Sequence, residues 1–237
     1  MSPDSARVWL IPARLPEPVV TAVARTLGED ERRRAEAMAR PDERRRFVLA
    51  HGATRVLLGD RLGVPPERIR WSRSRHGKPE LAYPGDAAQV SLSHSDELIA
   101  VAVTVRRPVG VDVQRVPVAA HASRVCARFF PPGDVAYVTA DGSGAGLAER
   151  FTELWTRKEA CVKAAGGRMA DGLGMPVHGS APLVVGYGGA GNEGAPAAER
   201  RYRVTDLAAP RGYRAALALR GEGGFQVRWS WWYGGEG

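Results

Sequence analysis

Cysteine and long apolar runs are both scarce in this chain. Its 237 residues include only Cys126 and Cys161, which do not stand at metal-ligand spacing. The opening residues lack the pattern of a signal peptide, and no apolar stretch approaches the roughly 18 residues that span a bilayer. These absences argue against a disulfide framework, a cysteine-based zinc site and a membrane partner. They favour a cytoplasmic protein with reduced thiols.

Lysine is almost absent as well. The 34 basic residues consist of 31 arginines and only Lys78, Lys158 and Lys163. Because a lysine ammonium is a compact point charge that a planar guanidinium does not reproduce, these three are candidate phosphate-binding or proton-transfer groups. The net charge of +8 favours an anionic partner: a nucleic acid, an acidic protein or a phosphorylated small molecule.

Hydrophobic periodicity predicts the same order of elements, strand, helix and strands, before and after residue 108. The helical patterns cover 18–62, with a break at Pro41, and 146–165, whereas 123–140 is mixed. Strands are expected at 7–12, around a Gly-Lys-Pro turn, on both sides of 93–97, after Pro108, and near 201–206, 213–219 and 225–233. The glycine-rich segment 186–198 predicts a mobile loop.

Asp112 lies in a β-branched strand, VGVDVQ at 109–114, where aspartate is unusual. Strand alternation places Asp112 and Gln114 on one face. Either Asp112 caps the following turn, or it binds a countercharge such as a hard divalent cation.

The helix at 146–165 carries the remaining candidates. Lys158 falls within its apolar stripe, so its ammonium must meet a carboxylate or a phosphate. Glu159 and Lys163 are four residues apart and share a face. They form either an ordinary surface ion pair or part of a functional site.

Two shorter segments are compatible with phosphate contacts. Ser93 and His94 stand in SLSHS, where hydroxyls and an imidazole meet at a strand end, and Lys78 stands in HGKP. Each segment alone is also compatible with an ordinary turn.

Taken together, HGKP at 76–79, SLSHS at 91–95, VGVDVQ at 109–114 and LWTRKEACVKA at 154–164 resemble the successive motifs of the Sfp-type 4′-phosphopantetheinyl transferases. The W-x-x-K-E-A-x-x-K form resembles the W/KEA subgroup, which serves polyketide and non-ribosomal peptide synthases in secondary metabolism. The resemblance covers about residues 45–165.

The resemblance implies an α+β fold, a pseudo-dimer of two similar α/β lobes, each with a small, mostly antiparallel sheet packed on a long helix. The lobes would be residues 1–108 and 109–237, with the active site in the cleft between them. It also implies a Mg2+ site made by Asp112, Gln114 and Glu159. The coenzyme A contacts implied by the resemblance are Arg46, Arg55, Lys78, Ser93, His94 and Lys158.

The expected reaction is transfer of 4′-phosphopantetheine from coenzyme A to a serine of an acidic acyl- or peptidyl-carrier protein, with release of 3′,5′-ADP. Asp112, Glu159 and Lys163 would be catalytic, with Glu159 as the general base and Lys163 at the leaving phosphate. Position 114 is Gln where many members have Glu, which predicts weaker metal binding.

We expect a monomeric enzyme with no nucleic-acid partner, since the chain has no recognition-helix, zinc-finger or RNP pattern. Two alternatives stay open. One is a coenzyme A-binding homologue without activity, and the other is a basic nucleic-acid-binding protein.

Overall fold

The structure is a computed structural model that describes residues 4–85, 88–140, 142, 144–189, 191–192 and 194–235. The strands are β1 (Ser5–Pro12), β2 (Arg70–Arg73), β3 (Pro79–Tyr83), β4 (Gln89–Ser95), β5 (Leu98–Thr104), β6 (Val109–Arg115), β7 (Leu183–Gly186), β8 (Arg201–Leu207), β9 (Tyr213–Arg220) and β10 (Gln226–Trp231). The helices are α1 (Glu17–Ala24), α2 (Glu29–Glu36), α3 (Pro41–Leu62), α4 (Ala119–Phe129), α5 (Pro132–Thr139), α6 (Gly144–Ala165) and α7 (Met169–Gly172), with 3-10 turns η1 (Pro66–Arg68) and η2 (Ala197–Arg200). Among these residues, no helix is both long and apolar enough to cross a membrane.

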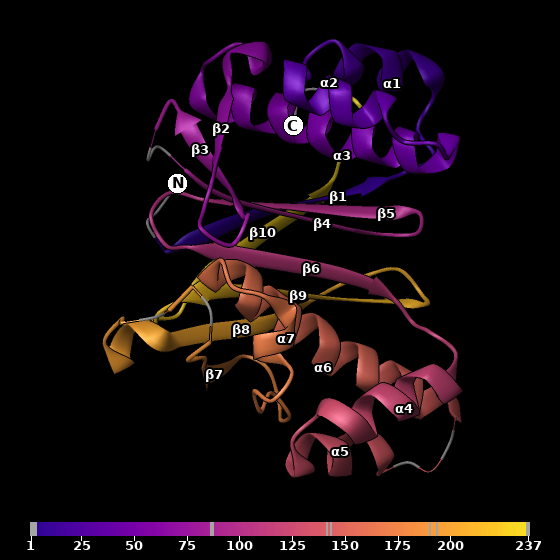
Figure 1. The fold of residues 1–237 in the computed structure, drawn as a ribbon, viewed down its shortest axis with the longest axis vertical. Helices are drawn as coiled ribbons and strands as arrows, with labels where there is room; N and C mark the ends of the chain where they lie inside the picture. The colour runs from indigo at the N-terminus through magenta and orange to yellow at the C-terminus, as the bar shows by residue number, and fades with distance from the viewer. Residues whose placement is uncertain are drawn as a thin grey trace.

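Four layers follow one another in Figure 1: helices α1 to α3, a first sheet, a second sheet, and helices α4 to α6. The alternation of β1 explains how the first sheet joins two layers. Trp9 and Ile11 belong to the core under the helices, whereas Val8 and Leu10 belong to the core between the sheets. The α+β fold with two lobes, each having a small sheet and a long helix, is therefore confirmed.

The first sheet has the strand order β10-β1-β5-β4. Its pairs β1–β5 and β4–β5 are antiparallel, but β10 pairs with β1 in parallel. The end of the chain thus returns to the sheet formed by the beginning of the chain. The division into 1–108 and 109–237 stays a prediction, and residues 226–231 lie in the first sheet.

The second sheet has the order β6-β9-β8-β7 and is antiparallel throughout. Helix α6 packs on its outer face, where Phe151, Leu154 and Val162 are buried. The mixed segment 123–140 forms two helices, α4 and α5, separated at Phe130 and Pro131.

The loop that follows β7 contains a buried anchor. Asn192 is 1% exposed, its amide nitrogen donates to the carbonyl of Tyr187 at 2.7 Å, and its amide oxygen accepts from the Tyr202 hydroxyl at 2.9 Å. The predicted mobility of 186–198, part of which lies outside the described residues, stays a prediction.

Candidate active site

The close approach of α6 to β6 depends on Gly110. A Cβ atom at this position would lie 1.9 Å from the carbonyl oxygen of Ala160 and 2.5 Å from the amide nitrogen of Ala164. Only glycine allows this approach. Because Gly110 and Asp112 share a face of β6, the approach brings the α6 side chains next to Asp112.

Asp112 is the centre of the site. It is 4% exposed, and its Oδ1 accepts hydrogen bonds from Ser93 Oγ at 2.6 Å and Lys163 Nζ at 2.7 Å. Its Oδ2 is buried and has no hydrogen-bond partner within the part of the chain that the structure describes. A buried carboxylate oxygen without a donor is costly unless a cation binds it.

Glu159 provides a second carboxylate. Burial raises its pKa, and the nearby charge of Asp112 raises it further, whereas Lys163 lowers it. A carboxylate whose ionisation is disfavoured by burial and by a neighbouring negative charge is stabilised in its ionised form by a divalent cation.

A third oxygen can come from Gln114, which is half-buried on the same face as Asp112. Its amide nitrogen donates to the carbonyl of Arg115 at 3.4 Å. The described residues contain no cluster of three or more His, Cys, Asp or Glu side chains with metal-ligand geometry. The oxygen donors present here, two carboxylates and an amide, are those that fit a hard cation such as Mg2+, which completes its shell with water and substrate oxygens.

The surroundings of this site are electropositive. The pKa of His94 is lowered by burial and then by the charges of Lys163, Arg46 and His51, while Asp112 opposes this effect. His94 therefore lies within electrostatic reach of Arg46 and Lys163, and the phosphate contacts expected of these residues stay predictions.

Ser93 belongs to a row of serines that joins the two sheets. The hydroxyls of Ser91, Ser93 and Ser95 on β4 accept hydrogen bonds from backbone N–H groups of β6. These bonds come from Val111 at 3.0 Å, Val113 at 3.4 Å and Arg115 at 3.0 Å. The alternating serines of SLSHS thus hold β4 and β6 side by side. The Ser93 hydroxyl donates its proton to Asp112 Oδ1. The phosphate contact expected of Ser93 stays a prediction.

Lys78 reaches the junction of the two halves from the turn between β2 and β3. Its Nζ donates to the carbonyls of Val109 at 3.2 Å and Ala164 at 3.3 Å. Burial lowers its pKa to about 8, with Glu80 opposing and Arg220 adding to the shift.

The structure does not bring Lys158 to this site. Its side chain is fully buried, with Nζ 2.6 Å from Asp134 Oδ2 and 4.4 Å from the centre of the Phe130 ring. The sequence left either a carboxylate or a phosphate as the partner of the Lys158 ammonium, and the structure shows a carboxylate. The expected coenzyme A contact of Lys158 is wrong, because its ammonium is inside the core of the second half.

Arg55 is likewise a structural residue. It is 2% exposed, its Nε is 2.6 Å from Glu31 Oε2, and its NH1 donates to the carbonyls of Pro66 and Ile69, each at 3.0 Å. The expected phosphate contact of Arg55 is therefore also wrong, since these acceptors surround its guanidinium.

Of the predicted site residues, the structure brings together Asp112, Glu159, Lys163, Ser93, His94, Arg46 and Gln114, with Lys78 further along β6. Sequence reasoning missed Gly110, whose position two residues before Asp112 was a usable signal. It also missed Ser91 and Ser95, whose period of two matches the serine row.

Comparisons with known proteins place the chain in a family. A family model described as the 4′-phosphopantetheinyl transferase superfamily matches residues 108–183, which contain β6 and α6. The 4′-phosphopantetheinyl transferase HetI of Nostoc sp. is 32% identical over 169 residues, which cover 70% of this chain and 71% of that protein.

Two further relatives are more distant. A putative 4′-phosphopantetheinyl transferase of Synechocystis sp., slr0495, is 28% identical over 172 residues, or 72% of this chain and 69% of that protein. The 4′-phosphopantetheinyl transferase gsp of Aneurinibacillus migulanus is 29% identical over 142 residues, or 56% of this chain and 55% of that protein. The chain belongs to the 4′-phosphopantetheinyl transferase superfamily, whose members use coenzyme A and act on carrier proteins.

Proposed function

We propose that this protein transfers 4′-phosphopantetheine from coenzyme A to a serine of an apo carrier protein and releases 3′,5′-ADP in a Mg2+-dependent reaction. The observation that carries the proposal is the buried, partnerless Oδ2 of Asp112 next to the ionisable Glu159. The site would serve a reaction at the junction of the halves 1–108 and 109–237.

Asp112, Glu159 and Gln114 would hold the Mg2+ ion. When bound, Mg2+ would neutralise the negative charge on the phosphate oxygens. Gln114 contributes an uncharged oxygen where a glutamate would add a negative charge, so we propose weaker metal binding than a three-carboxylate site would have.

The chain's own residues would position and transfer the proton. The hydroxyl oxygen of the carrier serine attacks the β-phosphorus of coenzyme A, and the bond from that phosphorus to the bridging oxygen breaks. Glu159 would accept the serine proton, directly or through a water molecule, as the carboxylate on α6 beside Asp112. The electron pair leaves with 3′,5′-ADP, and Lys163 stabilises the developing charge.

Arg46, His94 and Lys78 would contact coenzyme A. Arg46 and His94 lie near Lys163, and they add positive charge to the side on which the pyrophosphate would bind. Ser93 would orient Asp112 and Lys163, to which its hydroxyl is hydrogen-bonded.

An exposed apolar and basic surface on α4 would dock the carrier protein. Val118 is 75% exposed and Phe129 is 43% exposed, and the Arg128 guanidinium carbon lies 5.1 Å from the centre of the Phe129 ring. Exposed Arg124 adds a further cation. Such a surface suits an acidic carrier, and the W-x-x-K-E-A motif favours carriers of polyketide and non-ribosomal peptide synthases.

One observation favours a second candidate. Gln114 removes a negative charge from the metal site, as expected of a homologue that binds coenzyme A without modifying carriers. Such a homologue would be thermally stabilised by coenzyme A but would leave every apo carrier unchanged.

The test is incubation with apo carrier protein, coenzyme A and Mg2+, followed by intact mass. We expect a gain of about 340 Da on the carrier with the wild-type enzyme, and no gain with Glu159→Gln. Asp96→Asn removes an exposed carboxylate that is paired with Arg115, and it is the matched control that should keep full activity. No gain with any carrier of a broad panel would refute the proposal.

A further inference from the structure

Arg220, at the end of β9, belongs to none of the motifs that define the active site. Its Nε is buried without a hydrogen-bond partner in the described part of the chain. One NH2 group donates to Asn192 Oδ1 at 3.3 Å, and the guanidinium also contacts the Tyr202 hydroxyl. Both partners are neutral.

Lys78 is a second cation in the same place. It donates to two backbone carbonyls. Burial lowers the pKa of Lys78, the charge of Glu80 opposes this shift, and the nearby charge of Arg220 adds to it. Within the described ranges, no carboxylate lies within ion-pair distance of Lys78 or Arg220, and Glu80 acts on Lys78 only from further away.

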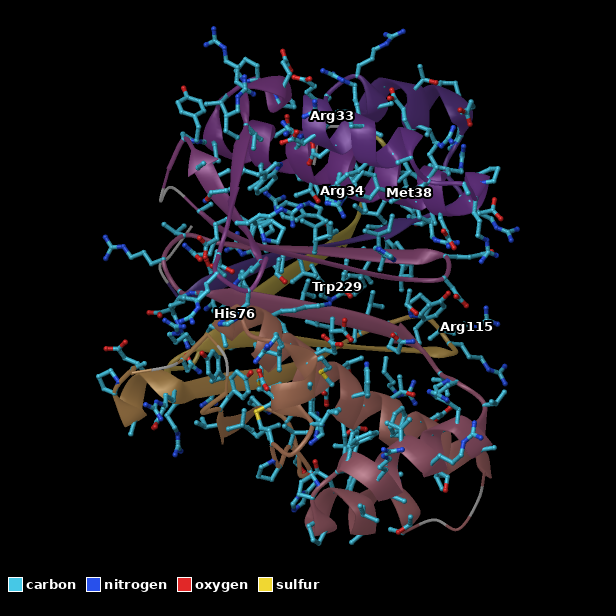
Figure 2. All side chains as sticks on the ribbon, in the orientation of Figure 1. Arg33, Arg34, Met38, His76, Arg115 and Trp229 are labelled. Atoms are coloured by element: carbon cyan, nitrogen blue, oxygen red, sulfur yellow. The ribbon has the colours of Figure 1, made fainter. Side chains whose placement is uncertain are left out.

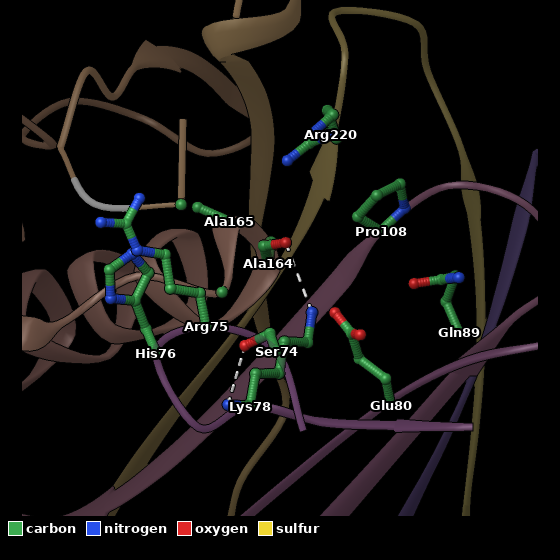
Figure 3. Close-up of a pocket in the computed structure, with 12 residues that line it drawn as sticks. Ser74, Arg75, His76, Lys78, Glu80, Gln89, Pro108, Ala164, Ala165 and Arg220 are labelled. Carbon is green, nitrogen blue, oxygen red and sulfur yellow. Dashed lines mark hydrogen bonds between the residues drawn. The ribbon is translucent and has the colours of Figure 1, made fainter. Parts of the chain in front are cut away.

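The two side chains face a cavity of about 330 Å³, shown in Figure 3. Its wall consists of the turn between β2 and β3, the last turn of α6, and the starts of β4 and β6, besides Arg220. Arg75 adds a third cation, and Glu80 is the single carboxylate among the residues that line it. The lining therefore has a net positive charge.

Partly buried cations that outnumber the carboxylates around them are costly, and an anionic ligand relieves that cost. A guanidinium with free N–H groups matches the oxygens of a phosphate group. We propose that this cavity binds a phosphate group, with Arg220 as its guanidinium ligand and Lys78 as the second cation.

The cavity lies at one end of the seam between β4 and β6. Figure 2 shows His76 at this end and Arg115 at the other end. Asp112 is three residues along β6 from Val109, or about 10 Å at the usual strand rise. The phosphate group can therefore be part of coenzyme A, in which case the inference rests on the proposed function, or it can be a separate phosphate anion.

The experiment measures three dissociation constants by calorimetry at constant ionic strength: those of coenzyme A, 3′-dephospho-coenzyme A and inorganic phosphate. The proteins are the wild type, Arg220→Met, Arg220→Lys and Arg211→Met. Arg211 is exposed in the turn before β9, so its variant removes one positive charge without touching the cavity.

We expect Arg220→Met to raise the dissociation constant of at least one ligand by about tenfold or more. Arg220→Lys should recover part of the lost affinity. Arg211→Met should bind all three ligands with wild-type affinity. If only coenzyme A binds more weakly, the cavity holds its 3′-phosphate. If coenzyme A and 3′-dephospho-coenzyme A both bind more weakly, the cavity holds the pyrophosphate. If only inorganic phosphate binds more weakly, the cavity holds a separate anion. Unchanged binding of all three, a loss that lysine does not recover, or an equal loss in Arg211→Met would overturn the inference. A wild type that fails to bind coenzyme A would refute the proposed function, while the inorganic phosphate titration would still test the cavity.

Discussion

At the scale of single residues, Gln114 is the unusual member of the site. It lies on the same face of β6 as Asp112, where we propose that its amide oxygen contacts the cation. We expect Gln114→Glu to lower the Mg2+ concentration at half-maximal rate by about tenfold, because a third carboxylate attracts the cation more strongly.

The measurement is the transfer rate as a function of Mg2+ concentration. Gln226→Glu places the same charge on exposed β10 and is the control. An unchanged Mg2+ dependence in Gln114→Glu would show that this side chain does not face the metal.

The three lysines have different partners despite their shared rarity. Lys158 is fully buried against Asp134, so Lys158→Ala leaves the buried Oδ2 of Asp134 without its ammonium, while Oδ1 keeps its contacts with Val177 and His178. We expect it to lower the free energy of unfolding by about 3–5 kcal/mol. The folded fraction should still bind coenzyme A with wild-type affinity.

Denaturant unfolding and calorimetry at low temperature check both parts. Normal stability together with weakened coenzyme A binding would place Lys158 in the phosphate site after all.

At the scale of elements, the contact between β6 and α6 has no room for a side chain at Gly110. We expect Gly110→Ala to force the helix away from the strand, at a cost of about 3 kcal/mol. It should also reduce transfer, because Asp112 separates from Glu159 and Lys163.

Thermal unfolding and the transfer rate test this prediction. Gly186→Ala is the matched control, since a Cβ atom at Gly186 meets nothing within 4 Å. Equal effects of the two substitutions would contradict the close-packing argument.

Helices α2 and α3 are joined by a buried charge. Burial of Glu31 opposes its ionisation, but His51, the Gly28 N–H group and Arg55 outweigh this effect and lower its pKa to about 2, from a usual value of 4.5. A lowered carboxylate pKa adds stability that is present above pH 4.5 and is lost as the pH falls toward 2. The linked contribution is about 3 kcal/mol at neutral pH.

Glu31→Gln should therefore be less stable at pH 7, and its stability should fall less steeply between pH 4.5 and pH 2. Urea unfolding over this range measures both effects. Glu36→Gln, on the exposed side of the same helix, should behave like the wild type. The same acid dependence in Glu31→Gln and the wild type would contradict the assignment.

Periodicity in the sequence predicted most of the strands and long helices, because each depends on local alternation of buried and exposed residues. It did not predict that β10 pairs with β1, since residues more than two hundred positions apart leave no local pattern. For the same reason the partners of Lys158 and Arg55, which come from other elements, could not be assigned from spacing.

At the scale of the whole molecule, the two halves meet where the serine row of β4 faces β6. Ser93, Asp112 and Lys163 are contributed by both halves, so the site exists only when the halves are joined. The motifs located these residues individually, and the junction explains why they lie together.

The most direct measurement is the binding of Mn2+, as a paramagnetic substitute for Mg2+, followed by electron paramagnetic resonance in the presence of coenzyme A. Wild type and Asp96→Asn should each bind one ion per chain, while Asp112→Asn and Glu159→Gln should each lose about two orders of magnitude in affinity. If either of these two variants bound Mn2+ as tightly as the wild type, its carboxylate would not hold the ion and the proposed site would be wrong.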